Sequence, residues 1–320
     1  MGAVPDVDGA TGRAAERTPF TARGRSDAAF SGRDWALLAF VGLVFGSSFL
    51  FIEIGLTSLS PPVITFLRLL LGYLTLSLFP RVRTVRLSRT DGLRASAIGL
   101  IWLGIPLMLF PVAQQWIDSS VAGMFNGAMP LTAVAWTALL ARTLPGRTQA
   151  LGLSIGFLGV VAITLPEIPA VGGLGTAQTL LGALLALTAA SMYGLAATLV
   201  APLQQRYGSL PVLHRAQGAA ILFVLPFALW GLRDSSFSWP AMLAMIPLGI
   251  LGTALAFIAI TTLIGSVGAP RGSVAVYLTP IVAIALGVTF LEEQVHPLAF
   301  AGALLIVLGA WLTSRREIIR

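Results

Sequence analysis

The sequence predicts an all-α polytopic membrane protein with ten transmembrane helices, arranged as two inverted repeats of five helices each (5+5). Three observations predict this class: an apolar composition, ten apolar runs of membrane length, and an internal repeat. Of the 320 residues, 56% are hydrophobic and only 10% are charged. An ordinary soluble domain has about 25% charged residues, so the composition excludes a soluble enzyme.

The ten apolar runs are justified by length and by pattern. About 20 apolar residues in a helix cross a bilayer core about 30 Å thick, and continuous rather than alternating apolar sequence disfavours a barrel. In chain order the predicted spans are Trp35–Ile54, Pro62–Phe79, Ala95–Gln115, Ser119–Ala141, Thr148–Leu165, Gln178–Leu199, Val212–Gly231, Trp239–Ile264, Gly272–Leu291 and Leu298–Thr313.

The spans divide the chain into two repeats and two tails. Residues 1–33 lack an apolar stretch and predict a disordered cytoplasmic tail. The first repeat is expected at residues 35–165, the second at 178–313, and a basic cytoplasmic tail at 314–320. No secretory signal precedes the first span, so we expect that span to act as an uncleaved signal.

Arginine placement predicts the orientation. All 20 basic residues are arginine, and positive residues concentrate in cytoplasmic segments. With both termini in the cytoplasm, 17 arginines fall on that side, against Arg233 alone outside and Arg68 and Arg215 inside spans. We therefore expect a multi-pass membrane protein with both termini in the cytoplasm. The composition, with arginine as its basic residue and much glycine and alanine, is typical of a bacterial chain. We attribute the net charge of +7 to arginines that orient the chain in the membrane. We therefore expect no nucleic acid partner.

Scarce residue types exclude several kinds of site. The chain has no cysteine and two histidines, which leaves no disulfide framework and too few imidazoles for a multi-histidine metal centre. Without lysine there is no Gly-x-x-x-x-Gly-Lys-Ser/Thr phosphate loop. We expect no metal, no cofactor and no direct use of ATP.

A shift of 150 positions aligns the two halves without gaps over their later parts. The identities are Gly99 with Gly249, Pro130 with Pro280, Ala133 with Ala283, Ala135 with Ala285, Gly152 with Gly302, and Leu158-Gly159 with Leu308-Gly309. Because five spans are an odd number, the copies must have opposite orientations. Inverted repeats recur in transporters, where the substrate path lies between the halves; duplication without transport is the alternative.

Several loose motifs recur in a specific order. They are Val44-Phe45-Gly46-Ser47-Ser48-Phe49, Ser60-Pro61 before Phe66-Leu67-Arg68, then Pro130, Pro280, Leu291-Glu292-Glu293 and the two Gly…Leu-Gly endings. Because of these motifs, their order and their duplication, the chain resembles the EamA family of the drug/metabolite transporter (DMT) superfamily. The resemblance covers roughly residues 35–165 and 180–313. The resemblance implies an inner-membrane permease that exports amino acids or related metabolites.

The chain departs from the family pattern at two places. Where the family usually has Gly-Glu, the first half has Arg142-Thr143, and in the second half Glu292 replaces the glycine while Glu293 keeps the acid. The arginine at position 68 corresponds to Gln217 in the second half. These departures put in doubt a role for the acid in the first half. They do not affect the predicted fold.

Arg68 and two carboxylates are the charged candidates. A cation inside a span costs several kcal/mol, so Arg68, expected near the outer end of its helix, either snorkels, forms a structural ion pair with Glu53 or a loop carboxylate, or contacts an anionic substrate. Glu53 and Asp118 are candidate proton-coupling carboxylates, with solvated helix ends as the alternative.

Polar and aromatic residues inside the spans are the candidates for the substrate path. They are Trp102, Gln114, Asn126, Tyr193, Gln217 and Tyr277. A buried amide must find a partner, so the amides either link helices or face a cavity. Prolines within spans free carbonyl groups, and Pro130, Pro280, Pro106 and Pro247 are candidate hinges, with fixed helix curvature as the alternative.

These observations together predict a secondary transporter or exporter of small amino-acid-like or drug-like metabolites, working by alternating access, with proton coupling as an option. A non-transporting membrane scaffold or a channel is the main alternative. An intramembrane enzyme is disfavoured, because the acids are single and scattered, and we therefore expect no catalytic activity.

Overall fold

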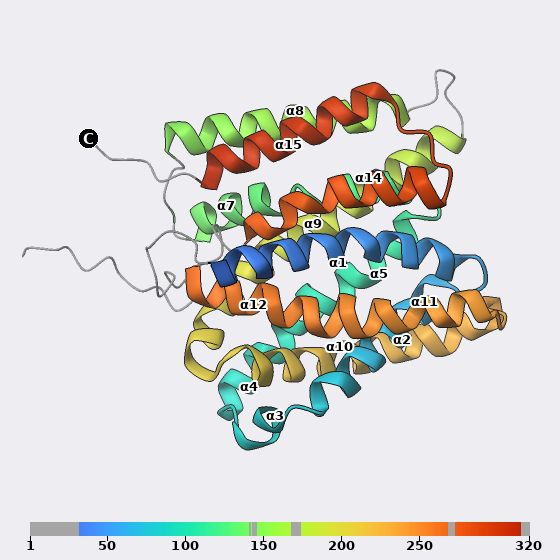
Figure 1. The fold of residues 1–320 in the computed structure, drawn as a ribbon. Helices are drawn as coiled ribbons and strands as arrows, with labels where there is room; N and C mark the ends of the chain where they lie inside the picture. Colours follow the sequence, from blue (N-terminus) through green and yellow to red (C-terminus); the bar gives the residue numbers. More distant parts are fainter. Residues whose placement is uncertain (1–31, 141, 143–145, 168–173, 268–272, 315–320) are drawn as a thin grey trace, which may run out of the picture.

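The computed structural model describes residues 32–140, 142, 146–167, 174–267 and 273–314. Both predicted tails therefore lie almost wholly outside the described residues. The described residues are nearly all helical and contain no strand. Figure 1 shows the long helices lying side by side, with their ends gathered at two opposite ends of the bundle.

Residues 32–167 form the first group of helices. Their bounds are α1 (Gly32–Leu56), α2 (Pro61–Ser77), α3 (Pro80–Thr84), α4 (Arg89–Gly99), η1 (Leu100–Gly104), α5 (Ile105–Ala113), α6 (Ser119–Asn126), α7 (Met129–Leu140) and α8 (Arg147–Glu167). Prolines in the first turn start α2 and α3, where the missing N–H has no helical partner to lose.

Residues 174–314 form the second group. Their bounds are α9 (Leu174–Tyr207), α10 (Ser209–Gly231), η2 (Leu232–Asp234), α11 (Trp239–Gly249), η3 (Ile250–Leu255), α12 (Ala256–Val267), η4 (Ser273–Leu278), α14 (Thr279–Phe290) and α15 (Pro297–Ser314). The 34-residue α9 extends beyond the predicted span at both ends and continues through Pro202.

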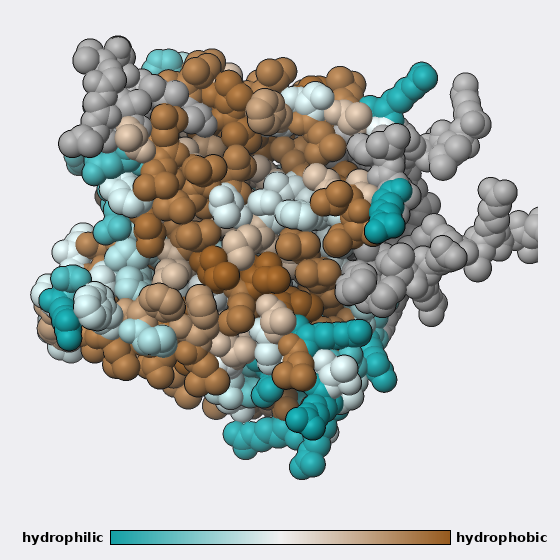
Figure 2. All heavy atoms as spheres, turned by 180° about the vertical axis from the view of Figure 1, so that it is seen from behind, coloured by the Kyte–Doolittle hydropathy of each residue, from teal (hydrophilic) through white to brown (hydrophobic). Residues whose placement is uncertain are grey.

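Within the described residues, five helical stretches are long and apolar enough to cross a membrane. They are Gly32–Leu56, Arg89–Ala113, Ala177–Tyr207, Ser209–Asp234 and Trp239–Ile264, and shorter apolar helices cover Pro61–Ser77, Ala150–Ile163, Ala275–Phe290 and Pro297–Gly309. Figure 2 shows apolar residues over the middle of one face and hydrophilic residues mainly toward the ends. The chain is therefore a polytopic helical membrane protein, and the count of ten crossings stays a prediction.

Two predicted spans are broken rather than continuous. The predicted fourth span divides at Gly127-Ala128 into α6 and α7, and the predicted ninth span begins as the 3₁₀ helix η4 before continuing as α14. The breaks lie at equivalent places, since Pro130 and Pro280 each follow one of them, at the second residue of α7 and of α14. Apolar periodicity carries no signal for such breaks, because the sequence is apolar on both sides of each break.

Two π-helical turns also lie at equivalent places. The turn η1 separates α4 from α5, and η3 separates α11 from α12, starting 150 residues later. Such turns insert an extra residue into a helix and are frequent at functional sites. Pro106 follows η1 and Pro247 precedes η3, so the prolines lie beside the turns rather than at matching positions.

The helices α8 and α15 pack against each other through the repeated glycines. A Cβ at Gly159 would lie 2.6 Å from the Gly302 carbonyl oxygen, and a Cβ at Gly309 would lie 2.5 Å from that of Gly152. Small residues allow such close backbone approach. Because the early glycine of each helix meets the late glycine of the other, these two equivalent helices are antiparallel, as they would be on either side of a two-fold axis.

Candidate functional site

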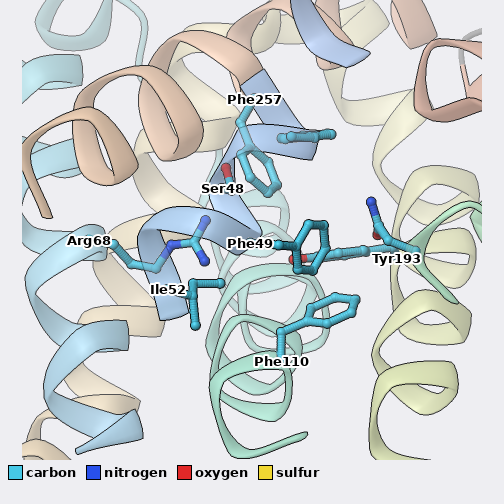
Figure 3. Close-up of a pocket in the computed structure, with 9 residues that line it drawn as sticks. Ser48, Phe49, Ile52, Arg68, Phe110, Tyr193 and Phe257 are labelled. Atoms are coloured by element: carbon cyan, nitrogen blue, oxygen red, sulfur yellow. The ribbon is translucent and has the colours of Figure 1, made fainter. Parts of the chain in front are cut away.

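A small cavity lies in the middle of the bundle, between helices of both groups. Its volume is about 30 Å³, which is room for one or two water molecules. The lining side chains come from α1, α2, α5, α6, α9 and α12 and are Phe45, Ser48, Phe49, Ile52, Arg68, Phe110, Asn126, Tyr193 and Phe257. Figure 3 shows Arg68 on one side of this cavity and Tyr193 on the other.

Arg68 is the charged residue of this cavity. It lies in the middle of the 17-residue α2, not near the helix end as expected from sequence, and its side chain is only 3% exposed. The guanidinium Nε donates a hydrogen bond to Thr253 Oγ1 at 3.1 Å. Within the described residues the ion pairs are those of Asp91, so the structural ion pair between Arg68 and Glu53 is not found.

Aromatic rings form the wall opposite Arg68. Phe257 contacts Phe45 and Trp102 edge to face, with ring centroids 5.3 Å apart in each pair. Phe110 contacts Phe49 at 5.2 Å and Tyr193 at 5.9 Å. Such contacts hold the rings in defined positions, and they leave an apolar surface facing a cation.

A much larger opening lies at the end of the bundle where α1 ends. Its volume is about 850 Å³, and its wall includes Glu53, Gln114, Pro61, Trp230 and Asp234. We call this opening the vestibule. Gln114 connects it to the cavity, because its Nε2 donates to Glu53 Oε2 and to the Phe49 carbonyl oxygen, both at 3.1 Å.

Glu293 joins the two groups of helices near the vestibule. Its carboxylate accepts hydrogen bonds from Ser119 N at 2.9 Å, from Ser119 Oγ at 2.6 Å and from Ser120 N at 3.0 Å. It thereby caps the N-terminus of α6, where unpaired N–H groups favour an anion. The sequence indicated only that Glu293 keeps the acid of the family pattern. Its equivalent in the first half, Thr143, lies outside the described residues.

Asp118 lies beside this cap and has no hydrogen bond to the first turn of α6. Although its side chain is exposed, neighbouring helix ends displace part of its water and raise its pKa, and the negative charge of Glu293 raises the pKa further. Glu53 and Asp118, the two candidate coupling carboxylates, thus lie near each other at the vestibule end.

A different polar cluster ties the opposite end of the bundle. Asp91, at the start of α4, accepts hydrogen bonds from Arg206 Nη1 and from the Tyr207 hydroxyl, both at 2.8 Å. Asp91 is buried, whereas the Arg206 side chain is 67% exposed. Sequence reasoning missed this cluster, because an acid and an arginine at two distant helix ends each resemble an ordinary solvated residue.

Four of the six path candidates lie outside the cavity wall, Gln114 among them. Trp102 is buried in η1 behind Phe257, and Tyr277 is buried in η4. The fully buried Gln217 donates from Nε2 to the Leu69 carbonyl oxygen at 2.8 Å, linking α10 to α2. The cavity therefore brings together Asn126, Tyr193 and Arg68, and Gln114 adjoins it.

The sequence profile of the EamA-like transporter family matches residues 34–165 and 180–315. The chain is 23% identical to the "Uncharacterized transporter YoaV" of Bacillus subtilis over 87% of this chain and 97% of that one. It is 26% identical to the "Probable terminal-alkyne amino-acid exporter" of Streptantibioticus cattleyicolor over 89% and 94% of the two chains.

The fold is also similar to that of a solved crystal structure. The TM-score is 0.59 at 18% sequence identity, over 88% of this chain and 96% of the other. This likeness concerns the fold alone. The two family matches together cover both groups of helices and leave out the first 33 residues.

Proposed function

The chain belongs to the EamA-like transporter family and is a membrane transporter, and we propose that it exports small amino-acid-like or drug-like metabolites by alternating access. In this proposal the two five-helix repeats cross the membrane ten times in opposite orientations and rock around the central cavity. Export is the direction given in the name of the Streptantibioticus relative.

The observation that carries this proposal is the central cavity. It lies between helices of both repeats, contains the buried Arg68 and is separated by Gln114 from a vestibule at one end. A volume of about 30 Å³ holds no metabolite, because small-molecule sites measure about 300–1,000 Å³. The helices must therefore move apart to admit a solute, as a carrier requires and a static pore does not.

We place the arginine-rich end of the bundle in the cytoplasm of a bacterial inner membrane. This end includes Arg81, Arg83, Arg86 and Arg89 around α3, and the cluster of Asp91 with Arg206. The excess of arginine supports this orientation. The vestibule then faces outward, and the Asp91 cluster holds the cytoplasmic end together.

Glu53 and Asp118 are the proposed proton-coupling groups. Glu53 lines the vestibule beside Gln114, where a proton from outside reaches it before the cavity opens. In an exporter, proton binding on this side would be linked to release of the solute.

Counterflow in proteoliposomes tests the proposal. Vesicles preloaded with an unlabelled apolar amino acid should take up the labelled one transiently and saturably, because exchange through a carrier occupies a limited number of sites. Empty liposomes provide the control. Ionic conductance that does not saturate, or no counterflow for any amino acid, aromatic carboxylate or amphipathic drug, would contradict the proposal.

A further inference from the structure

We infer that the central cavity is an anion site, in which Arg68 binds the carboxylate of an amphipathic solute and rejects cationic ones. This inference rests on the proposed transport function and deepens it by naming the charge of the solute. It starts from the absence of a counterion for Arg68 in the described part of the chain. Removing one partner from a buried ion pair is strongly destabilising, so an unpaired buried arginine indicates a partner that comes and goes.

The π turn η3 orients the guanidinium. The Thr253 hydroxyl donates to the Leu248 carbonyl oxygen at 2.9 Å, across the five-residue spacing of the turn, and so presents a lone pair to Arg68 Nε. With Nε held, the terminal nitrogens remain for a ligand. A guanidinium presents two parallel N–H groups to a carboxylate, which a point charge such as ammonium does not.

Space beside the guanidinium is kept open by Gly252. A Cβ there would lie 2.8 Å from Ser48 Oγ and 3.9 Å from Arg68 Nη2. Figure 3 shows the Arg68 side chain reaching from α2 toward Ser48, Phe49 and Ile52 of α1. The end of the guanidinium therefore faces the cavity and not the lipid, which excludes snorkelling.

The other side of the cavity offers a second polar group. Asn126, 3% exposed, lines the cavity, and its side-chain oxygen makes no hydrogen bond to the described residues. A buried amide group without a partner costs free energy, and a hydroxyl or amino group on the solute would satisfy it. The rings of Phe49, Phe110 and Phe257 leave the space between the two polar groups apolar.

These features describe a solute with a carboxylate at one end, an apolar body and, optionally, a hydrogen-bond donor at the other end, facing Asn126. A purely cationic amphipath fits the rings through cation–π contacts but meets the positive charge of Arg68 in a site of low dielectric constant, where repulsion is strong. The cavity therefore selects against the cationic drugs that aromatic walls alone would accept.

Three probes with the same body separate charge from shape: 3-phenylpropionate, 3-phenylpropan-1-ol and 3-phenylpropylamine. Their binding to the purified full chain in detergent is measured by titration calorimetry. We expect the carboxylate to bind about tenfold or more tightly than the alcohol, and the amine more weakly still. Equal or tighter binding of the amine by the wild-type chain overturns the inference without any variant.

Variants then assign the preference to Arg68. Arg68→Gln should abolish the preference for the carboxylate, whereas Arg68→Lys should keep it at reduced strength, because the charge stays but the planar fork is lost. Arg215→Gln is the matched control, since Arg215 also lies on a membrane helix but is exposed. A folded Arg68→Gln protein that still prefers the carboxylate overturns the inference.

Flux separates this inference from the proposed function. If the carboxylate binds through Arg68 but no solute shows counterflow, the inferred anion site is supported and the proposed transport function is contradicted. If a cationic solute shows counterflow that Arg68→Gln does not change, the proposed transport function is supported and the inferred anion site is contradicted.

Discussion

Two residues adopt a left-handed backbone where family members usually have glycine. Arg142 has φ 51° and Glu292 has φ 56°, and the two positions are equivalent in the repeats. The conformation costs roughly 1–2 kcal/mol for a residue with a side chain. Because the chain adopts it at both positions without glycine, the surrounding fold imposes the left-handed turn. In the second half the turn directs Glu293 back to α6.

Replacing Glu292 by glycine should stabilise the protein. Glycine removes the steric cost of about 1–2 kcal/mol but adds about 0.5–1 kcal/mol of chain entropy to the unfolded state, which leaves a net gain of about 0–1.5 kcal/mol. The melting temperature in detergent measures it. A lower melting temperature for Glu292→Gly would show that the side chain of Glu292 contributes more than the strained turn costs.

Glu293→Gln should destabilise the protein by about 1–2 kcal/mol. The amide loses the negative charge at the N-terminus of α6 and one of the two acceptor oxygens. Its neighbour provides the control, because Glu292→Gln changes the same charge at an exposed side chain. Equal melting temperatures for the two variants would argue against the cap.

Asp118 should make stability depend on pH. Because its pKa is raised in the folded protein, the folded state binds the proton more tightly than the unfolded state does, and stability from this group increases as pH falls through the folded pKa. Asp118→Asn should therefore raise the melting temperature at pH 7 and change it little at pH 4. The difference in melting temperature between variant and wild type, taken at each pH, measures the contribution of the Asp118 carboxyl.

At the scale of the helices, length and apolar runs predicted the elements well. The starts of α2, α11 and α15 follow from prolines in the sequence, whereas the π turns and the break between α6 and α7 do not, because both sides of each irregularity are equally apolar. The repeated glycines aligned the two halves in sequence, but that alignment does not name the helix that each glycine packs against. Only the fold reveals that Gly159 meets Gly302 rather than a lipid chain.

Gly159→Val should therefore separate α8 from α15. The added methyl groups would collide with the α15 backbone, which costs about 1–3 kcal/mol in a packed interior. Gly175→Val is the control, because nothing lies within 4 Å of a Cβ at that position. The yield of folded protein and its melting temperature should fall for Gly159→Val alone.

At the scale of the whole molecule, sequence reasoning identified the family and named three of the nine residues that line the cavity, but not their arrangement. Arg68, Asn126 and Tyr193 were candidates as isolated polar residues within apolar spans. Their convergence depends on the tertiary packing of α2, α6 and α9. The contact with Thr253 depends on a π turn that shifts the register of its helix by one residue, which residue spacing in the sequence does not reveal.

Both polar clusters between the repeats are closed in this structure. Glu293, just after the end of α14, joins the second group of helices to α6 at the vestibule end, and Asp91 joins α4 to α9 at the other end. Alternating access requires them to open in turn. Asp91→Asn should weaken the second cluster, because it removes the charge that pairs with Arg206. If opening at this end limits turnover, this substitution should raise the rate of counterflow.

The central claim is that the cavity around Arg68 opens to each side of the membrane in turn. The chain has no cysteine, so Ser48→Cys places a single thiol in the cavity wall, where a small membrane-impermeant thiol reagent can be applied from either side of oriented vesicles. We predict modification from both sides, slowed in each case by a bound carboxylate solute. Modification from one side only, whether or not a solute is present, would contradict the claim.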